Sequence, residues 1–218
     1  MRIELKNYSE QNKKWPQAGY HIMAQYDDKE IIVYQSYKKS IGIFAVNNQF
    51  FGGEFNFERM TWIKPNFLWM MYRNGWGTKQ DQEVVLAIHL KLTAFENYLK
   101  HAVYSSYHDE MNIEKEAWHQ QVQASSVRLQ WDPDHDPYGS KLPRRAIQIG
   151  LRNEFARSFA KEDILLIEDI SGFVTMQYTF VKHKQLEKLI TPAERPLIFK
   201  DDLLNKKLKL ELFQEKEV

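Results

Sequence analysis

The chain has 218 residues, and its 30 lysines and arginines against 29 aspartates and glutamates give a formal net charge of +1. A balance this close to neutral counts against nonspecific binding of nucleic acid, which depends on a broad basic surface. The absence of cysteine excludes disulfides, thiolate catalysis and cysteine-based zinc sites. No signal peptide and no run of about 20 apolar residues occurs, so we expect a cytoplasmic protein that does not enter membranes.

The first quarter of the chain predicts an arm, a hairpin and a helix. Residues 1–20 are polar and predict an extended arm. Residues 20–26 alternate loosely, residues 30–37 are β-branched and aromatic, and Asp27-Asp28 between them favours a turn. The apolar positions of residues 38–48 recur at helical spacing, so we expect a helix there.

Residues 59–77 form the stretch that is richest in aromatic and cationic side chains. Three of the six tryptophans lie here, at positions 62, 69 and 76. Pro65 is compatible with the first turn of a helix, and Gly75 is compatible with a left-handed helix cap. We therefore predict a helix from about Pro65 to Asn74 that is apolar around most of its circumference and hence buried.

The remaining patterns predict further strands, helices and one turn-rich loop. Strands are expected at residues 83–92, 127–131, 145–151 and 164–170. Helices are expected at residues 93–100, 112–122 and 154–161, a strand or a last helix at 172–182, and a turn-rich loop at 132–139. This order predicts one α+β domain over residues 1–182, with a mixed or antiparallel sheet and flanking helices. Residues 183–218 are expected to be a tail that is docked on the body or partly mobile.

Cations cluster at the two ends of the predicted Trp-rich helix. Arg59 and Lys64 precede it and Arg73 lies in its last turn, where their side chains can bind phosphate or carboxylate groups. Trp62 and Trp76 lie near the helix ends, where an indole can face a cleft. The alternative is a core helix with ordinary capping charges.

Polar residues in two strands provide further candidates. Tyr34 and Gln35 lie near the end of the strongest strand, next to a loop and a helix, although that polar side could simply face water. In residues 144–150, Arg145 and Gln148 fall on opposite faces of a strand. An arginine and a glutamine in a cleft would suit a nucleotide, and the alternative is an edge strand with a solvated face.

A cluster of carboxylates follows the strand that contains Arg128. Asp132, Asp134, His135 and Asp136 could together bind a hard cation. Their spacing does not match a calcium-binding loop, and aspartate with proline is also ordinary turn chemistry. We therefore expect no metal site here. Arg128, in the preceding strand, is a separate candidate for ligand binding.

Four blocks of the chain are similar to one known family. They are Tyr26–Gln35, Arg59–Gly77, Val127–Pro133 and Arg145–Leu151. These blocks resemble the domain of unknown function 4291 family, and the likeness covers about residues 10–180. Because that family is uncharacterised, the resemblance implies no reaction and no catalytic residues.

A second likeness involves the strand Val33–Tyr37, a helix containing Ala45, and the turn at residues 50–52. Together they resemble the opening of ADP-ribosyltransferase-like folds, which implies an NAD cofactor and a transferase acting on nucleic acid or protein. Gln35 stands where such enzymes usually have histidine or arginine, and Gln148 stands where they usually have glutamate. These departures weigh against transfer chemistry but leave an NAD-like or nucleotide-end ligand open.

The sequence thus predicts a domain that binds a nucleotide, either NAD or the end of a nucleic acid. If the domain is an enzyme, we expect an ADP-ribosyltransferase-like reaction. The candidate catalytic residues are Gln35, Gln148 and Arg59. The candidate ligand-binding residues are Tyr34, Trp62, Lys64, Arg73, Trp76, Arg128 and Arg145. The alternatives are a non-catalytic module for single-stranded nucleic acid and a structural or protein-binding domain. Convergence of these side chains on one cavity would favour the nucleotide.

Overall fold

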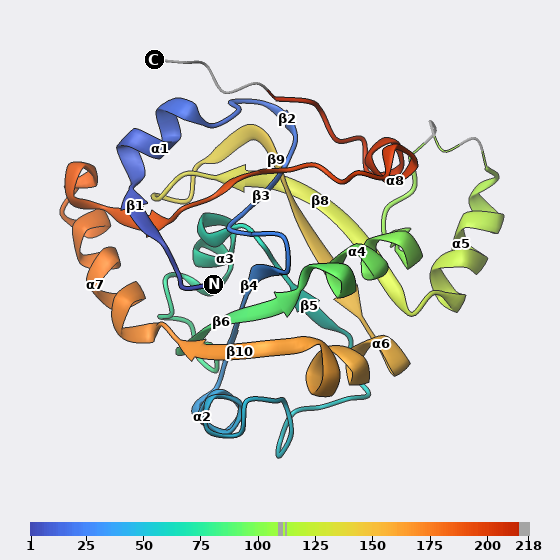
Figure 1. The fold of residues 1–218 in the computed structure, drawn as a ribbon, viewed down its shortest axis with the longest axis horizontal. Coiled ribbons are helices and arrows are strands. Elements are labelled where there is room, and N and C mark those ends of the chain that lie inside the picture. The colour runs from blue at the N-terminus through green and yellow to red at the C-terminus, as the bar shows by residue number, and fades with distance from the viewer. Residues whose placement is uncertain (109–110, 112, 214–218) are drawn as a thin grey trace.

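The computed structural model describes residues 1–108, 111 and 113–213, in which helices surround several small β-sheets (Figure 1). This is the α+β arrangement that the sequence predicts. Within this described part, each helix is too short or too polar to span a bilayer. The α-helices are α1 (Tyr8–Lys14), α2 (Lys39–Asn48), α3 (Phe67–Asn74), α4 (Leu92–His101), α5 (Lys115–Ala124), α6 (Asn153–Ser158), α7 (Ser171–Lys182) and α8 (Asp202–Lys207).

The described strands form one antiparallel sheet of three, one mixed sheet of five and two short pairs. The three-stranded sheet has the order β10–β6–β4, and the larger sheet has the order β2–β9–β8–β7, with β5 also paired to β9. The short pairs are β1–β11 and β12–β3. The strands are β1 (Leu5–Asn7), β2 (Gly19–Tyr20), β3 (Ile22–Ala24), β4 (Glu30–Tyr37), β5 (Thr61–Ile63), β6 (Val84–Lys91), β7 (Val103–Tyr104), β8 (Val127–His135), β9 (Lys141–Leu151), β10 (Ile164–Asp169), β11 (Ile190–Pro192) and β12 (Arg195–Leu197).

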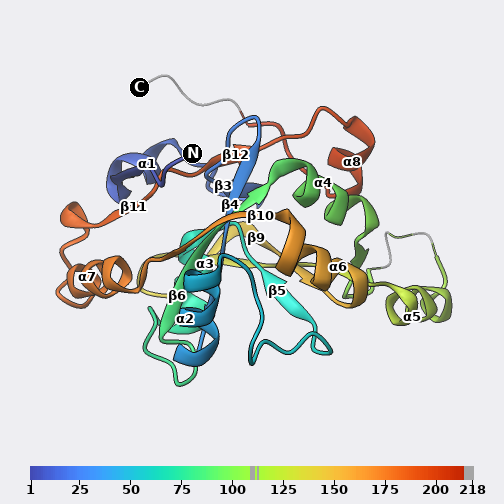
Figure 2. The same cartoon turned by 60° about the horizontal axis from the view of Figure 1, so that its bottom comes forward.

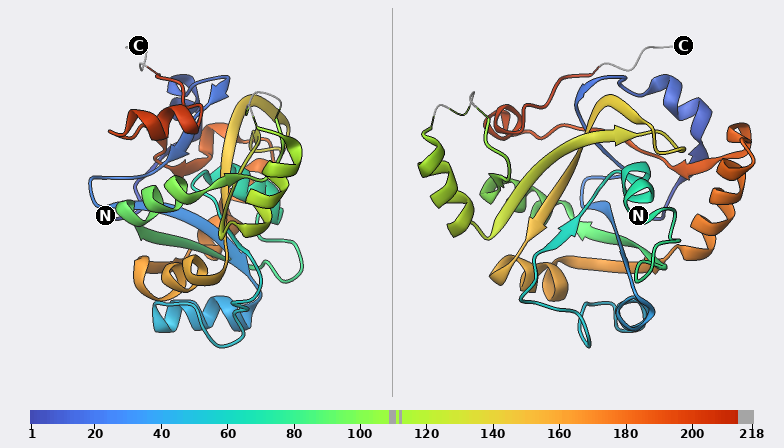
Figure 3. Two further views of the ribbon diagram at one scale, coloured as in Figure 1. Left: turned by 90° about the vertical axis from the view of Figure 1, so that its right-hand side faces the viewer. Right: turned by 180° about the vertical axis from the view of Figure 1, so that it is seen from behind.

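Strand β4 is buried on both faces because it serves two hydrophobic cores. Ile31 and Val33 pack in a core with residues of β8, β9 and α4, whereas Ile32 and Tyr34 pack in a second core with residues of α3 and α7. Alternate side chains of a strand point to opposite faces, so one strand can contribute to both cores. Seen from behind, the long β8–β9 hairpin crosses over the three-stranded sheet (Figure 3, right).

Helix α3 is the predicted Trp-rich helix, and its ends follow the local chemistry. The side chain of Asn66 accepts a hydrogen bond from the Trp69 N–H at 2.6 Å and caps the first turn. Gly75 ends the helix in the left-handed conformation, with φ at 60°. Most of the helix is buried, but Tyr72 and Arg73 in its last turn are exposed.

The first 20 residues contain a helix where the sequence predicts an extended arm. Helix α1 begins after Asn7, whose side chain accepts a hydrogen bond from the Glu10 N–H at 3.2 Å. This cap satisfies an N–H group of the first turn. Tyr8 and Gln11 are buried, so α1 packs on the body through one side although its composition is polar.

The C-terminal segment is docked on the body over its described residues. Strand β11 pairs with β1 and β12 pairs with β3, so both ends of the chain share two small sheets (Figure 2). Leu204 and Leu208 are buried in the main core. Residues 183–213 therefore complete the same domain, and residues 214–218 of the predicted tail lie outside the described residues.

The prediction of a turn-rich loop at residues 132–139 is wrong in its first half. Strand β8 continues to His135, and the turn is confined to residues 136–139. Pro133 is accommodated next to an irregular step, because the pairing with β9 shifts register between Pro133 and His135. Local turn preferences of aspartate and proline are thus overridden by pairing with β9, which local sequence does not reveal.

Other element boundaries differ by a few residues. Helix α5 begins at Lys115, whereas the prediction began at residue 112, which lies outside the described residues. The predicted helix at residues 154–161 corresponds to α6 and ends in a π-helical turn at Phe159–Asp163. Residues 172–182, which fitted either a strand or a helix, belong to α7.

Candidate functional site

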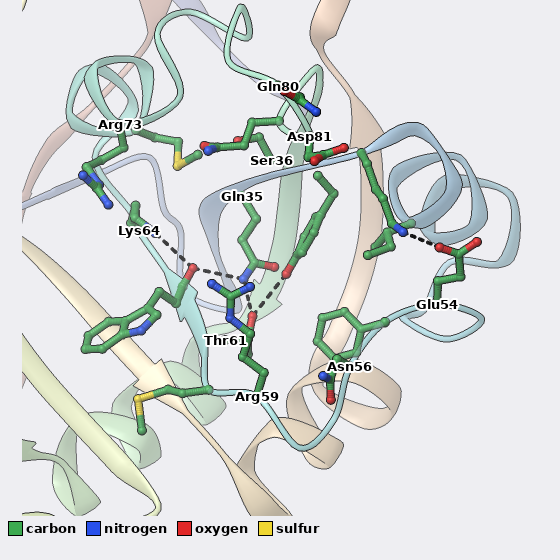
Figure 4. A pocket seen from close by; sticks show the side chains of 18 residues that line it. Gln35, Ser36, Glu54, Asn56, Arg59, Thr61, Lys64, Arg73, Gln80 and Asp81 are labelled. Atoms are coloured by element: carbon green, nitrogen blue, oxygen red, sulfur yellow. Dashed lines mark hydrogen bonds and ion pairs between the residues drawn. The ribbon is translucent and has the colours of Figure 1, made fainter.

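A cavity of about 530 Å³ lies between the end of β4, the segment around β5 and the last turn of α3 (Figure 4). A backbone hydrogen bond of 2.7 Å from the Tyr34 N–H to the Lys64 carbonyl ties two of these segments together. The cavity, termed the Lys64 cavity below, is lined by five of the candidate residues from the sequence: Gln35, Arg59, Trp62, Lys64 and Arg73. Residues distant in the sequence therefore meet at one concave surface.

Lys64 carries the most unusual electrostatic feature of this cavity. Its side chain is buried, and its Nζ donates a hydrogen bond of 3.2 Å to the Trp62 carbonyl. In the part of the chain that the structure describes, no carboxylate forms an ion pair with it. The pKa of Lys64 is lowered to about 7, mainly by burial and also by repulsion from Arg73, while attraction to Asp132 partly opposes both. An anion that entered the cavity would supply the missing countercharge.

Gln35 is held in a fixed orientation at the floor of the cavity. Its amide nitrogen donates to Thr61 Oγ1 at 2.7 Å and to the Trp62 carbonyl at 3.0 Å. The Tyr37 hydroxyl lies 3.1 Å from the same Thr61 oxygen, and burial raises the pKa of Tyr37. By contrast, Gln35 Oε1 and Ser36 Oγ are buried without a hydrogen-bond partner among the described residues. Such atoms are costly unless a partner reaches them.

The cavity is lined by a buried lysine and two exposed arginines, together with two exposed carboxylates. Figure 4 shows Arg59 reaching toward Gln35 from the loop before β5, with Arg73 on the opposite margin. Among the lining residues, the carboxylates belong to Glu54 and Asp81. Glu54 already pairs with the Lys38 ammonium. Three cations therefore face a space in which little negative charge balances them.

Gln148 lines a neighbouring hollow of about 260 Å³, termed the Gln148 hollow. Its amide donates to one oxygen of Asp132 at 2.8 Å, and the amide of Gln130 donates to the other at 2.8 Å. Arg73 lines both the Lys64 cavity and this hollow, so it lies between the two. The structure thus brings Gln35 and Arg59 together but sets Gln148 on the far side of Arg73.

Four other candidates lie away from the Lys64 cavity. The Tyr34 side chain is completely buried and packs edge-on against Phe67, so its ring offers no face to a ligand. Trp76 is buried as well, and its indole N–H donates to the Pro137 carbonyl at 3.2 Å. Arg128 and Arg145 do not line the cavity either. The sequence analysis assigned these four residues to strands or to the end of α3, but it could not show which way their side chains point.

A buried polar cluster that the sequence analysis missed fixes the start of α3. Arg144 binds Asp134 through Nε at 2.8 Å and through Nη2 at 2.6 Å, and it donates to the Pro16 carbonyl at 2.7 Å. Glu194 accepts a hydrogen bond of 2.6 Å from the Phe67 N–H in the first turn of the helix. Burial raises the pKa of Glu194 well above its usual range. This cluster joins β8, β9 and the C-terminal segment to α3, and no local pattern in the sequence reveals it.

The carboxylates that could have bound a cation point to separate partners. Asp132 accepts the two glutamine amides, and Asp134 binds Arg144. Asp136 accepts hydrogen bonds from the backbone N–H groups of Tyr138 and Ser140. Over the described residues, no group of three or more histidine, aspartate or glutamate side chains has the geometry to hold a metal ion.

Comparison with known proteins identifies one family. The family model described as "Domain of unknown function (DUF4291)" matches residues 21–197 of the chain. A search of curated proteins finds no match. The matched region includes every residue of the Lys64 cavity and of the Gln148 hollow.

Proposed function

We propose that this chain, which belongs to the DUF4291 family of unknown function, binds a nucleotide through its phosphates in the Lys64 cavity. The observation that carries the proposal is the buried Lys64 amine, which has no carboxylate partner in the described structure and is flanked by two arginines in one cavity. A buried cation without a counterion is costly, so it is retained where an anion completes the site.

The shape and lining of the cavity favour a nucleotide over a simple anion. A volume of about 530 Å³ falls in the range of small-molecule sites. Lys64 and Arg73 would contact phosphates, and Arg59 would reach a second phosphate or a carboxylate. The half-buried Trp62 indole would stack on a base, while Gln35 Oε1 and Ser36 Oγ would bond to ribose hydroxyls. NAD and the end of a nucleic acid both carry these groups.

NAD is the cofactor that we propose first. Gln35 and Arg59 are the catalytic candidates that lie in the Lys64 cavity, and Gln148 lies beyond Arg73. An ADP-ribosyltransferase-like reaction would therefore require a ligand that extends past Arg73, so that Gln148 can contact its ribose. Binding without transfer requires the Lys64 cavity alone.

Thermal unfolding in the presence of NAD, ADP-ribose, a 5′-phosphorylated dinucleotide, adenosine and inorganic phosphate tests this proposal. At a ligand concentration about 100-fold above Kd, binding adds about 2.7 kcal/mol, which corresponds to a rise in Tm of roughly 5–10 °C. We expect this rise with at least one phosphorylated nucleotide and none with adenosine. No rise with NAD, ADP-ribose or the dinucleotide at millimolar concentration would overturn the proposal.

The affinity for ADP-ribose should depend on pH through Lys64. Because the pKa of Lys64 is lowered to about 7, the amine loses its charge as pH rises above this value. A bound phosphate favours the charged form, so the affinity should fall by up to about tenfold for each pH unit above 7. Calorimetric titration between pH 6 and pH 9 measures this slope. A Lys64→Arg variant that still binds should show a flat profile, since its guanidinium does not titrate in this range.

A further inference from the structure

Two further hollows lie beyond the Lys64 cavity, around the exposed end of α3. The Gln148 hollow shares Arg73 with the Lys64 cavity. A third hollow of about 370 Å³, termed the Tyr178 hollow, lies between the end of α3, the turn after β8 and α7. Tyr72 lines both the Gln148 hollow and the Tyr178 hollow. Because each neighbouring pair shares a lining residue, the three spaces lie next to one another along a path around the last turn of α3.

Aromatic rings line this path, and two of them, Tyr72 and Tyr138, are exposed. Tyr72 is 40% exposed and stacks on His135, with ring centroids 3.5 Å apart. Tyr138 is 50% exposed at the rim of the Tyr178 hollow. Tyr178 is half-buried and stacks on Trp76 with 5.8 Å between centroids. Rings placed in sequence along a groove are the surfaces on which unpaired bases stack.

The charge along the path is positive although the chain as a whole is nearly neutral. Arg73, Lys141, Lys182 and Lys184 are exposed and line the two smaller hollows. Among their lining residues, Asp132 is the only one with a carboxylate, and both of its oxygens accept glutamine amides. Cations and aromatic rings together line these hollows, and this combination complements a phosphate backbone that carries bases.

Two buried polar groups along the path lack protein partners. His135 is 3% exposed, and neither of its ring nitrogens has a hydrogen-bond partner in the described residues. The indole N–H of Trp69, a residue that is 2% exposed, is likewise unpaired. Both residues line the Gln148 hollow. These unpaired donors and acceptors are groups to which a polar ligand in the hollow would bond.

We propose that the Gln148 hollow and the Tyr178 hollow bind a single strand of RNA or DNA and lead its terminal nucleotide toward the Lys64 cavity. Binding of the strand depends on the stacking rings and on the cations of these two hollows. Only the last step, the placement of the terminal nucleotide, rests on the function proposed for the Lys64 cavity. A rigid duplex lacks unstacked bases and should bind more weakly than a single strand.

Fluorescence anisotropy with labelled ten-nucleotide single-stranded RNA, single-stranded DNA and duplex DNA tests this proposal. The Lys182→Ala/Lys184→Ala double variant should weaken single-strand binding about fivefold or more. It should also reduce the salt slope of the association constant by about 1.4, since each phosphate contact contributes about 0.7. Tyr138→Ala should weaken binding roughly tenfold through the loss of a stacking ring. The RNA and DNA arms show which strand the path prefers.

The Lys115→Ala/Lys206→Ala variant is the matched control, because it removes the same charge from exposed lysines on α5 and α8, at the opposite edge of the molecule from α7 (Figure 1). It should leave binding unchanged. Equal losses in both double variants, equal binding of duplex, or binding of an acidic peptide as tight as the strand would overturn the proposal. ADP-ribose binding is measured in parallel. If ADP-ribose binds and the strand does not, this inference fails and the Lys64 cavity proposal stands. If the strand binds and ADP-ribose does not, the Lys64 cavity proposal fails and strand binding by the two hollows stands.

Discussion

The Lys64→Met variant is expected to lose nucleotide binding. At pH 6.5 its free energy of unfolding should be higher than that of the parent protein. Hydrogen bonds to charged groups contribute about 1.5–3 kcal/mol each, so removing the amine should weaken binding by about 10- to 150-fold. The gain in stability has a separate cause. Methionine fills a similar volume without a polar group, and it removes the cost of burying an amine that lacks a countercharge.

The stability gained by the Lys64→Met variant should depend on pH. The pKa of Lys64 is lowered from 10.5 to about 7 in the folded protein, so the unfolded chain binds more protons between these values. The free energy of unfolding of the parent protein should therefore rise with pH across this window. The advantage of Lys64→Met should be largest below pH 7 and should shrink toward pH 10.5. Urea unfolding at pH 6.5 and pH 9.5 measures the difference.

Lys38→Met is the matched control for Lys64→Met. Lys38 also lines the Lys64 cavity, but its side chain is accessible and is paired with Glu54. Its ammonium is already neutralised, so its loss should change nucleotide affinity by less than about threefold, in keeping with the small contribution of exposed ion pairs. Similar losses of affinity in both lysine variants would contradict a special role for Lys64.

Arg144→Met should produce the largest loss of stability. Arg144 is 2% exposed and binds Asp134, which is fully buried, while Glu194 lies in the same cluster. Removing the guanidinium leaves a buried carboxylate without its partner, and such changes typically cost 3–5 kcal/mol. Urea unfolding at neutral pH measures the loss. For a chain of this size it corresponds to a fall in Tm of roughly 6–20 °C.

The adjacent residue provides the control for Arg144→Met. Arg145 is half-buried on the opposite face of β9 and forms no ion pair with a described carboxylate. Arg145→Met should therefore cost less than about 1 kcal/mol, as is usual for surface positions. If both variants lost the same stability, the cluster at the start of α3 would not be the structural anchor described above.

The local signals in the sequence located the centre of the site. The end of helix α3 was recognisable from Gly75, and β4 from its β-branched and aromatic residues, because these preferences act within a few residues. The start was predicted at Pro65, whereas the structure begins the helix at Phe67, after the N-cap Asn66. The cations around α3 followed from the same stretch. The structure adds that Gln35, Arg59, Trp62, Lys64 and Arg73 meet at one cavity.

The remaining features depend on contacts between distant residues. Tyr34 and Gln35 are adjacent on β4, but the sheet is covered on both faces, so the outward face of the strand could not be identified from alternation alone. The extension of β8 depends on pairing with β9. The ion pair of Arg144 with Asp134 joins two strands whose register was unknown. The sharing of Arg73 between two cavities likewise requires the complete fold.

The central claim is that the buried Lys64 amine binds an anionic ligand. Titration of this amine is the most direct test. Side-chain NMR of ¹⁵N-labelled lysine, assigned with Lys64→Met, follows the amine from pH 5 to pH 11. We expect a pKa near 7 in the protein alone and a clear increase when ADP-ribose is added. A pKa near the ordinary value of 10.5, or a lowered pKa that no phosphorylated nucleotide raises, would contradict this account.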